Sequence, residues 1–227
     1  MGDFLTANTY FGIGITVSAF AAGRAMQAKW KSPACNPILI ATLAVALVLL
    51  STGIPVDTYQ ESCAPLQYLL TPATICYAVS LHEQIARLKK NLLAILTGVI
   101  CGTLVSLFSI RLMCSAFGLG EVLTVSLLPK SITTAIGMPL SQEAGGIPAL
   151  TTAAIIISGI LGNMFGPALC KIFGIHNPIA QGVSFGTASH AIGTARAAEL
   201  CALTGAVSSL SLTIAGLVTV VLYSFLI

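Results

Sequence analysis

The sequence predicts an all-α polytopic membrane protein with seven or eight membrane segments, two or three of them discontinuous or re-entrant. Of the 227 residues, 56% are hydrophobic and only 7% are charged, whereas a soluble domain carries about 25% charged residues. The mean hydropathy is +0.96. Several apolar runs also approach the roughly 20 residues that a membrane helix needs. So few charges cannot cover a water-facing surface, so we expect the solvent to be a lipid bilayer.

Six apolar runs are continuous enough to cross a bilayer. They cover residues 5–26, 36–53, 65–82, 91–117, 147–173 and 205–227. Asp3 stands where a signal peptide would be basic, so the first run is expected to be a mature membrane helix. Two further runs, 121–141 and 178–200, are interrupted by Pro, Gly and charged residues. These two are the candidates for re-entrant or broken helices.

The charges between the first runs predict their orientation. Basic residues follow the first run (Arg24, Lys29 and Lys31) and the third run (Arg87, Lys89 and Lys90). Acidic residues follow the second run (Asp57 and Glu61). Because basic loops stay cytoplasmic, the N-terminus is expected outside and the first four spans alternate. The number of segments stays at seven or eight, because 121–141 either crosses fully or forms a re-entrant hairpin.

Two pairs of similar segments raise the question of an internal repeat. "LLTPATICYAVSLHEQ" at 69–84 resembles "SLLPKSITTAIGMPLSQE" at 126–143, and "NPI" occurs at 36–38 and again at 177–179. Repeats are common in transporters, where broken helices of two halves form a site near the membrane midplane. Pro and Gly are also frequent in unrelated membrane helices, so both interpretations stay open.

Lys130 is a charged residue inside an apolar run. It stands in "LLPKSITTAIGMP", after Pro129, which removes a backbone donor and loosens the helix. Backbone groups left unpaired at membrane depth must face protein or a cavity. Lys130 is therefore a candidate anion-binding residue, and the alternative is a lysine that snorkels near a helix end. The neighbouring candidate hydroxyls are Ser131, Thr133 and Thr134.

The stretch "TASHAIGTAR" at 187–196 gathers hydrogen-bonding groups between two apolar runs. Gly186 and Gly193 permit unusual backbone geometry, and a helix that restarts there would point amide groups at an anion. The candidate binding side chains are Thr187, Ser189, His190, Thr194 and Arg196.

Two of these side chains have competing interpretations. His190 would either carry a proton or take part in hydrogen-bonded helix packing, and the absence of a second His nearby in sequence favours packing slightly. Arg196 would either hold a carboxylate with two hydrogen bonds or pair with Glu199 on the same helix face.

A third interruption is "LLTPATICYAV", in which Thr71 and Thr74 flank Pro72. A Pro kink relieved by Thr side chains is ordinary in membrane helices. Three interruptions rich in Ser or Thr nevertheless favour one shared polar site, formed by segments 69–78, 128–139 and 186–196. "SGILGNMFGP" at 158–167 has a different role: its spaced glycines predict close helix packing, with Asn163 donating a hydrogen bond across the interface.

Other classes of protein find no support in the sequence. The seven cysteines show neither a CxxC pair nor zinc-like spacing, so no metal or cofactor is expected. The net charge of +3 is small and its basic residues are scattered, which argues against a nucleic-acid partner. No GxSxG or HExxH pattern is present, and the adjacent Ser189 and His190 do not face each other on a helix. We therefore expect no enzyme activity.

The chain resembles the LrgB/CidB family of bacterial membrane proteins. "LLPKSITTAIGMPLSQEAGGIPALT", "GILGNMFGPALCKIFGIHNPIAQG", "GTASHAIGTARAAEL" and "LLTPATICYAVSLHEQIARLKK" carry the resemblance. It extends over nearly the whole chain and implies one transmembrane domain over 1–227, in the bacterial cytoplasmic membrane. The family usually has Pro at the position of Ala135, and Pro and Tyr at the positions of Ser80 and His82, which bears on the geometry of two broken helices.

The resemblance implies two functions. One is transport of small monocarboxylates such as glycolate, glycerate or pyruvate, because the plastidic glycolate/glycerate transporter looks like a fusion of the two family partners. The alternative is a holin- or antiholin-like modulator of murein hydrolase export and autolysis, working beside an LrgA/CidA-type membrane partner. Converging cations, hydroxyls and broken helices favour the carrier, working by alternating access within a homodimer. Fold analogy alone does not fix the function.

Overall fold

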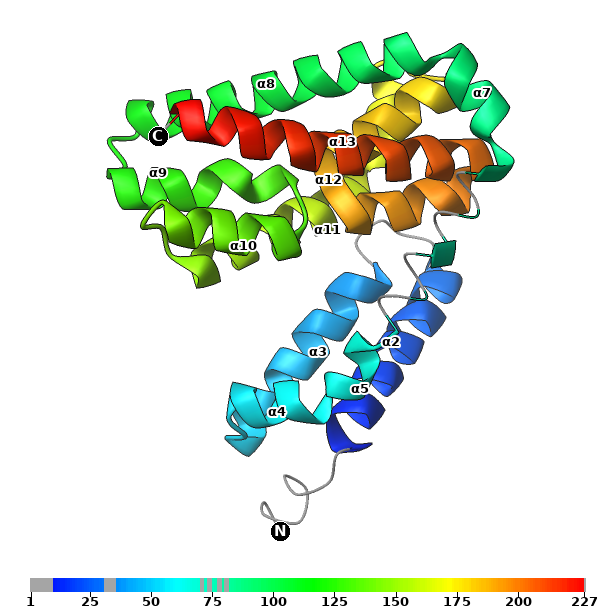
Figure 1. The fold of residues 1–227 in the computed structure, drawn as a ribbon. Helices are drawn as coiled ribbons and strands as arrows, with labels where there is room; N and C mark the ends of the chain where they lie inside the picture. The colour runs from blue at the N-terminus through cyan, green and yellow to red at the C-terminus, as the bar shows by residue number, and fades with distance from the viewer. Residues whose placement is uncertain are drawn as a thin grey trace. The chain divides into compact units, whose positions relative to one another are not determined.

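The computed structural model describes residues 10–30, 36–69, 72, 75–76, 79 and 82–226, and all regular secondary structure in these ranges is helical (Figure 1). The chain divides into two compact units, Met1–Cys76 and Tyr77–Ile227. We call them the N-terminal and C-terminal units and describe each by itself.

The N-terminal unit contains α2 (Tyr10–Trp30), α3 (Pro37–Thr52), α4 (Val56–Ser62) and α5 (Ala64–Gln67). Its first two helices correspond to the predicted runs 5–26 and 36–53. The side chain of Asn36 caps α3 by accepting hydrogen bonds from the amides of Ile38 and Leu39, and Gly53 ends it with a φ of 68°. Much of the predicted run 65–82 lies outside the described residues.

Three helices of the C-terminal unit are long and apolar enough to cross a membrane. They are α8 (Leu92–Ala116), α11 (Pro148–Ile172) and α13 (Ala202–Leu226), each of 25 residues. Each is about 37 Å long, which exceeds a hydrocarbon core of about 30 Å. They match the predicted runs 91–117, 147–173 and 205–227. The short helix α7 (Ile85–Lys90) holds the basic residues that precede α8.

The predicted interruption at 121–141 consists of two short helices and a break. α9 (Glu121–Leu127) leads into the 3-10 turn η2 (Leu128–Ser131), and α10 (Thr134–Glu143) follows. Pro129 has a ψ of 19°, and the next residues before α10 are extended. α10 has ten residues, which gives it a length of about 15 Å and is too short to cross a bilayer.

The chain folds back on itself across this break. The hydroxyl of Thr151 on α11 donates a hydrogen bond to the carbonyl of Ser126 at 2.9 Å and lies 2.7 Å from the hydroxyl of Ser141. Ser126 belongs to α9 and Ser141 to α10, so the same hydroxyl holds both sides of the break. Both sides of the break thus lie against α11, and the re-entrant hairpin stays a prediction. The turn η2 packs against α8, α11, α12 and α13.

α12 (Pro178–Leu200) covers the predicted segment 178–200 and lies along α13, as the orange and red ribbons of Figure 1 show. Only Cys201 separates the two helices. A Cβ on Gly182 would lie 2.6 Å from Val207, and a Cβ on Gly186 would lie 2.3 Å from the Ser208 carbonyl oxygen. Glycine at these positions therefore permits the close approach of α12 to α13.

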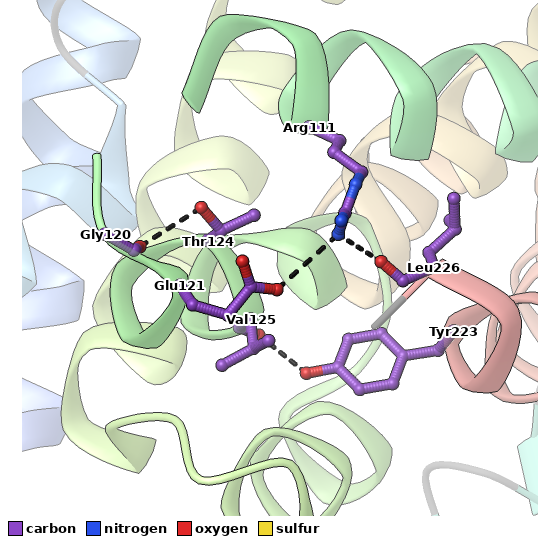
Figure 2. Close-up of polar contacts among 7 residues, drawn as sticks. All are labelled: Arg111, Gly120, Glu121, Thr124, Val125, Tyr223 and Leu226. Carbon is purple, nitrogen blue, oxygen red and sulfur yellow. Dashed lines mark hydrogen bonds and ion pairs between the residues drawn. The ribbon is translucent and has the colours of Figure 1, made fainter. Parts of the chain in front are cut away.

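Polar contacts join α8, α9 and α13 at one end of the C-terminal unit (Figure 2). The hydroxyl of Tyr223 donates a hydrogen bond of 2.7 Å to the carbonyl of Val125. Arg111 donates to the carbonyl of Leu226 and lies 3.7 Å from the carboxylate of Glu121. Tyr223 and Val125 also belong to a buried cluster whose other members are Leu107, Ile110, Cys114 and Leu128. These contacts hold α9, and hence the start of the hairpin, against the long helices.

Candidate functional site

The backbone of α12 breaks at His190. Its φ of 41° and ψ of −137° are not helical, and it is the only described residue other than glycine with a positive φ. The sequence placed the break in this stretch but attributed it to Gly186 and Gly193. Instead, Gly193 avoids a clash, because its Cβ would lie 2.4 Å from that of Ser189. Sparsely populated backbone geometry costs about 1–3 kcal/mol and persists only when the surroundings impose it.

The side chain of His190 is held by α11. Only 3% of the residue is exposed, and its Nε2 lies 2.8 Å from the carbonyl oxygen of Ile155. A carbonyl can only accept, so Nε2 carries the proton and donates this hydrogen bond. The contact supports the predicted packing role of His190.

The glycine stripe of α11, Gly159, Gly162 and Gly166, lies directly against the break in α12. Alanine at these three positions would place a Cβ 2.7 Å from the His190 ring, 1.7 Å from the Ser189 hydroxyl and 2.3 Å from the Phe185 ring. Asn163 donates a hydrogen bond of 3.0 Å to the carbonyl of Ile192 across the same interface. The predicted packing role of this stretch is therefore confirmed, as is the hydrogen bond from Asn163.

Lys130 lies on η2, beside the same helix α11. Its Nζ donates a hydrogen bond of 3.2 Å to the hydroxyl of Ser131, and its carbonyl accepts one of 2.8 Å from the hydroxyl of Ser158. Ser158 is less than one helical turn from Ile155, which accepts the hydrogen bond from His190. The two broken elements thus meet on one turn of α11.

A cavity of about 520 Å³ opens beside Lys130, within the range of about 300–1,000 Å³ that is usual for ligand pockets. Its polar lining consists of Lys130, Ser158, Ser184 and Ser189. Its apolar lining includes Leu161, Phe165, Leu169, Phe173 and Phe185. Lys130 is the only charged residue in this lining. One cation with three hydroxyls and an apolar wall suits a small anion that has an apolar part. We call this the large cavity.

A second cavity, of about 10 Å³, is lined by hydroxyl-bearing residues of four elements. These residues are Thr103, Ser106, Ser131, Thr187 and Thr219, and the apolar members of the lining are Leu107, Leu128, Ile132 and Ala215. The hydroxyl of Ser106 lies 2.9 Å from that of Ser131. We call this the small cavity. Ser131 lines it, while the preceding Lys130 lines the large cavity, so both cavities adjoin the same turn.

The remaining predicted site residues lie elsewhere or have other partners. Thr194 donates to the carbonyl of His190 at 2.9 Å and lies 2.8 Å from the hydroxyl of Ser208. Thr133 occupies the N-cap position of α10 without a side-chain capping hydrogen bond, and Thr134 begins the helix. Neither residue lines either cavity. Thr71 and Thr74 lie outside the described residues.

Arg196 forms an ion pair with Glu199 at 2.6 Å, the arrangement that the sequence offered as the alternative to ligand binding. It follows His190 by six residues, about 9 Å along a helix, and it lines neither cavity.

Sequence reasoning missed several polar residues of the two cavities. Thr103 and Ser106 lie on α8, Ser158 on α11 and Thr219 on α13. Each is a single hydroxyl within a strongly apolar run, which resembles ordinary helix packing. The spacing of three between Thr103 and Ser106 does place them on one helix face, and this is the only signal that we find for them.

No group of His, Cys, Asp or Glu residues in the described part of the chain could hold a metal ion. Three helices long and apolar enough to cross a membrane, together with a helix broken beside a polar cavity, are the features of a helical membrane protein. Residues 16–227 match the model of the LrgB-like family. The chain belongs to this family, which confirms the resemblance found in the sequence.

Relatives of this chain include proteins of Staphylococcus and Bacillus species. It is 34% identical over 213 residues to the holin-like protein CidB of Staphylococcus epidermidis, covering 94% of this chain and 93% of that protein. It is 33% identical over 213 residues to the holin-like protein CidB of Staphylococcus aureus, with the same coverage. It is 33% identical over 217 residues to the antiholin-like protein LrgB of Bacillus mycoides, covering 95% and 94%. No solved structure matches the chain.

Proposed function

We propose that this protein is a carrier of small monocarboxylates, such as glycolate, glycerate or pyruvate, in the bacterial cytoplasmic membrane. The observation that supports this is the position of Lys130, on the turn η2 and in the lining of the large cavity. A charged side chain at membrane depth is costly and by default indicates a functional site. Here the lining supplies no carboxylate to balance the ammonium group, so an anionic ligand would do so.

The chemistry of the large cavity fits the proposed substrates. The ammonium of Lys130 and the hydroxyl of Ser189 would donate hydrogen bonds to carboxylate and hydroxyl oxygens. The hydroxyl of Ser158 donates its proton to the carbonyl of Lys130, so it would accept a hydrogen bond from a substrate hydroxyl. The rings of Phe165 and Phe185 would contact the carbon chain. Of the residues predicted from sequence, this proposal depends on Lys130, Ser131, Thr187 and Ser189, while roles for Thr133, Thr134, Thr194 and Arg196 stay predictions.

Carriers with broken helices expose such a site alternately to the two sides of the membrane. We extend that expectation to this chain as one transmembrane domain, acting as a homodimer. The His190 break and the η2 break meet on α11, so a rigid movement of α11 would move both. Coupling to a proton through His190, coupling to sodium through backbone carbonyls, and facilitated diffusion are the alternatives for the driving force.

A second candidate is favoured by the relatives rather than by the cavity. Their names, holin-like CidB and antiholin-like LrgB, favour a modulator of murein hydrolase export and autolysis that acts with an LrgA/CidA-type partner. Such a protein would form or regulate a pore. A pore would pass unrelated solutes without saturation, which separates the two functions by experiment.

The test is uptake of labelled pyruvate, glycolate and glycerate into proteoliposomes that contain the full chain, with labelled sucrose as the unrelated solute. A carrier gives saturable carboxylate uptake and excludes sucrose. In Lys130→Ala we expect the rate of carboxylate uptake to fall at least tenfold. Lys171→Ala, which removes a lysine from the end of α11, is the matched control and should retain uptake. Passage of sucrose at a comparable rate would support the pore, as would carboxylate entry that does not saturate. If the chain alone is inactive, the same assay is repeated with an LrgA/CidA-type protein.

A further inference from the structure

The small cavity has more hydrogen-bonding capacity than its neighbours satisfy. Thr103 is 4% exposed and Thr187 is 7% exposed, and the described residues offer neither hydroxyl a hydrogen-bond partner. An unpaired buried polar group costs about 1–3 kcal/mol. Two such groups in the lining of one cavity indicate an occupant that pairs with both. The volume of about 10 Å³ admits one atom the size of a water oxygen.

The protons around the small cavity indicate what kind of atom this is. The hydroxyls of Ser106 and Ser131 have two protons between them, and their mutual hydrogen bond uses one. The hydrogen bond from Lys130 to Ser131 uses a proton of the lysine. The second hydroxyl proton of the serine pair therefore stays available to the cavity. Together with Thr103 and Thr187, at least three hydroxyl protons can therefore be donated to one central atom.

The positive charge of Lys130 near the small cavity also favours an anionic occupant. The ammonium group of Lys130 lies one hydrogen bond from Ser131, which lines the small cavity. No carboxylate lines the small cavity, so a metal cation there would face an unbalanced positive charge. An electronegative atom that carries negative charge would instead be stabilised by the hydroxyls and by Lys130.

We propose that the small cavity binds one oxygen of the substrate carboxylate and that Lys130 balances the charge of that group. This inference rests on the proposed function. It adds Thr103 to the binding residues and gives Thr187 a direct contact with the carboxylate. A water molecule would take the same place when no substrate is bound. Because the small cavity has room for a single oxygen, the rest of the substrate would lie outside it, toward Lys130.

The experiment measures pyruvate binding to the purified full chain by ligand-induced thermal stabilisation, and pyruvate uptake in proteoliposomes. The variants Thr103→Val and Thr187→Val remove one hydroxyl each at nearly constant volume. Thr204→Val is the matched control, because Thr204 is also a fully buried threonine but lines neither cavity. We expect the Kd and KM for pyruvate to rise about tenfold in both cavity variants and to stay within twofold of wild type in the control.

Thr187→Ser, which restores the hydroxyl, should recover most of the wild-type affinity. If Thr187→Val does not fold, the loss of pyruvate affinity is measured on Thr103→Val instead, and Thr187→Ser still tests position 187. Affinities within twofold of wild type in the cavity variants would overturn the inference and leave the carrier function standing, with the cavity holding only water. A wild-type protein that neither binds nor transports pyruvate, glycolate or glycerate would overturn both.

Discussion

The hydroxyl of Ser158 donates a hydrogen bond of 2.8 Å to the main-chain carbonyl of Lys130. This bond joins the middle of α11 to the 3-10 turn η2. One turn earlier, the carbonyl of Ile155 accepts the hydrogen bond from His190. α11 therefore supports both breaks in the backbone, through one donor and one acceptor that are three residues apart.

Removing the Ser158 hydroxyl should loosen the turn that holds Lys130. In Ser158→Ala the carbonyl of Lys130 loses its donor, so we expect a loss of about 1 kcal/mol in unfolding free energy and several-fold lower carboxylate uptake. Thr152→Ala is the control, since Thr152 bonds only the carbonyl of Pro148 in its own helix. Thermal unfolding and initial uptake rates measure the two effects. Equal uptake by the two variants would argue against a positioning role for Ser158.

Gly162 should tolerate no side chain. A Cβ there would lie 1.7 Å from the Ser189 hydroxyl and 2.5 Å from its Cβ, so Gly162→Ala should cost about 1–3 kcal/mol by overpacking. Combining it with Ser189→Gly removes the opposing atoms and should recover part of the loss in a double-mutant cycle. Gly14→Ala, where the added Cβ meets nothing within 4 Å, is the control. Additive losses in the cycle would show that the two residues do not meet.

Substitutions of His190 test the broken backbone, because at this position we expect glycine to be more stable than alanine, the reverse of their order inside a helix. Inside a helix, alanine is more stable than glycine by about 1 kcal/mol. At the φ of 41° of His190, glycine is the residue without strain. Both substitutions lose the hydrogen bond to Ile155, so His190→Gly should unfold at a higher temperature than His190→Ala. The opposite order would indicate a continuous helix. Ala195, six residues before Cys201, is a suitable position for an Ala→Gly control with the usual order.

Variants of the ion pair between Arg196 and Glu199 distinguish the two roles considered for Arg196, which are carboxylate binding and pairing with Glu199. Side-chain exposures of 31% and 64% predict a contribution to stability of no more than about 1 kcal/mol. Because Arg196 lines neither cavity, we expect Arg196→Ala and Glu199→Gln to lower uptake equally and by less than twofold. A tenfold loss in Arg196→Ala with normal uptake in Glu199→Gln would instead assign Arg196 to the carboxylate.

Hydrophobic pattern alone predicted α8, α11 and α13 to within a few residues at either end. Such helices pair every backbone group internally, so a run of apolar residues is sufficient to specify them. The fold-back within the run 121–141 was not predictable from that run alone, because it depends on Thr151, which bonds Ser126 and Ser141 from another helix. Tertiary contacts of this kind have no signature in a local window.

The candidate site was predicted only where polar residues gather in sequence. Lys130 and Ser189 stood out for that reason, and they line the same cavity. Thr103 was not found, because a single threonine in an apolar helix is ordinary. The break at His190 was assigned to the neighbouring glycines, since glycine is the usual source of positive φ. Here the imidazole bond to α11 helps to hold the strained residue.

The break at His190 also bears on biogenesis. A helix that is interrupted midway presents unpaired amide and carbonyl groups, which hydrocarbon does not solvate. α12 is therefore a poor candidate for release into lipid as a solitary segment. Its connection to α13 through Cys201 alone suits joint insertion of the two as a helical hairpin, with α11 already present to receive His190. Synthesis of the C-terminal unit in the order α11, α12, α13 supplies each partner before or together with the segment that needs it.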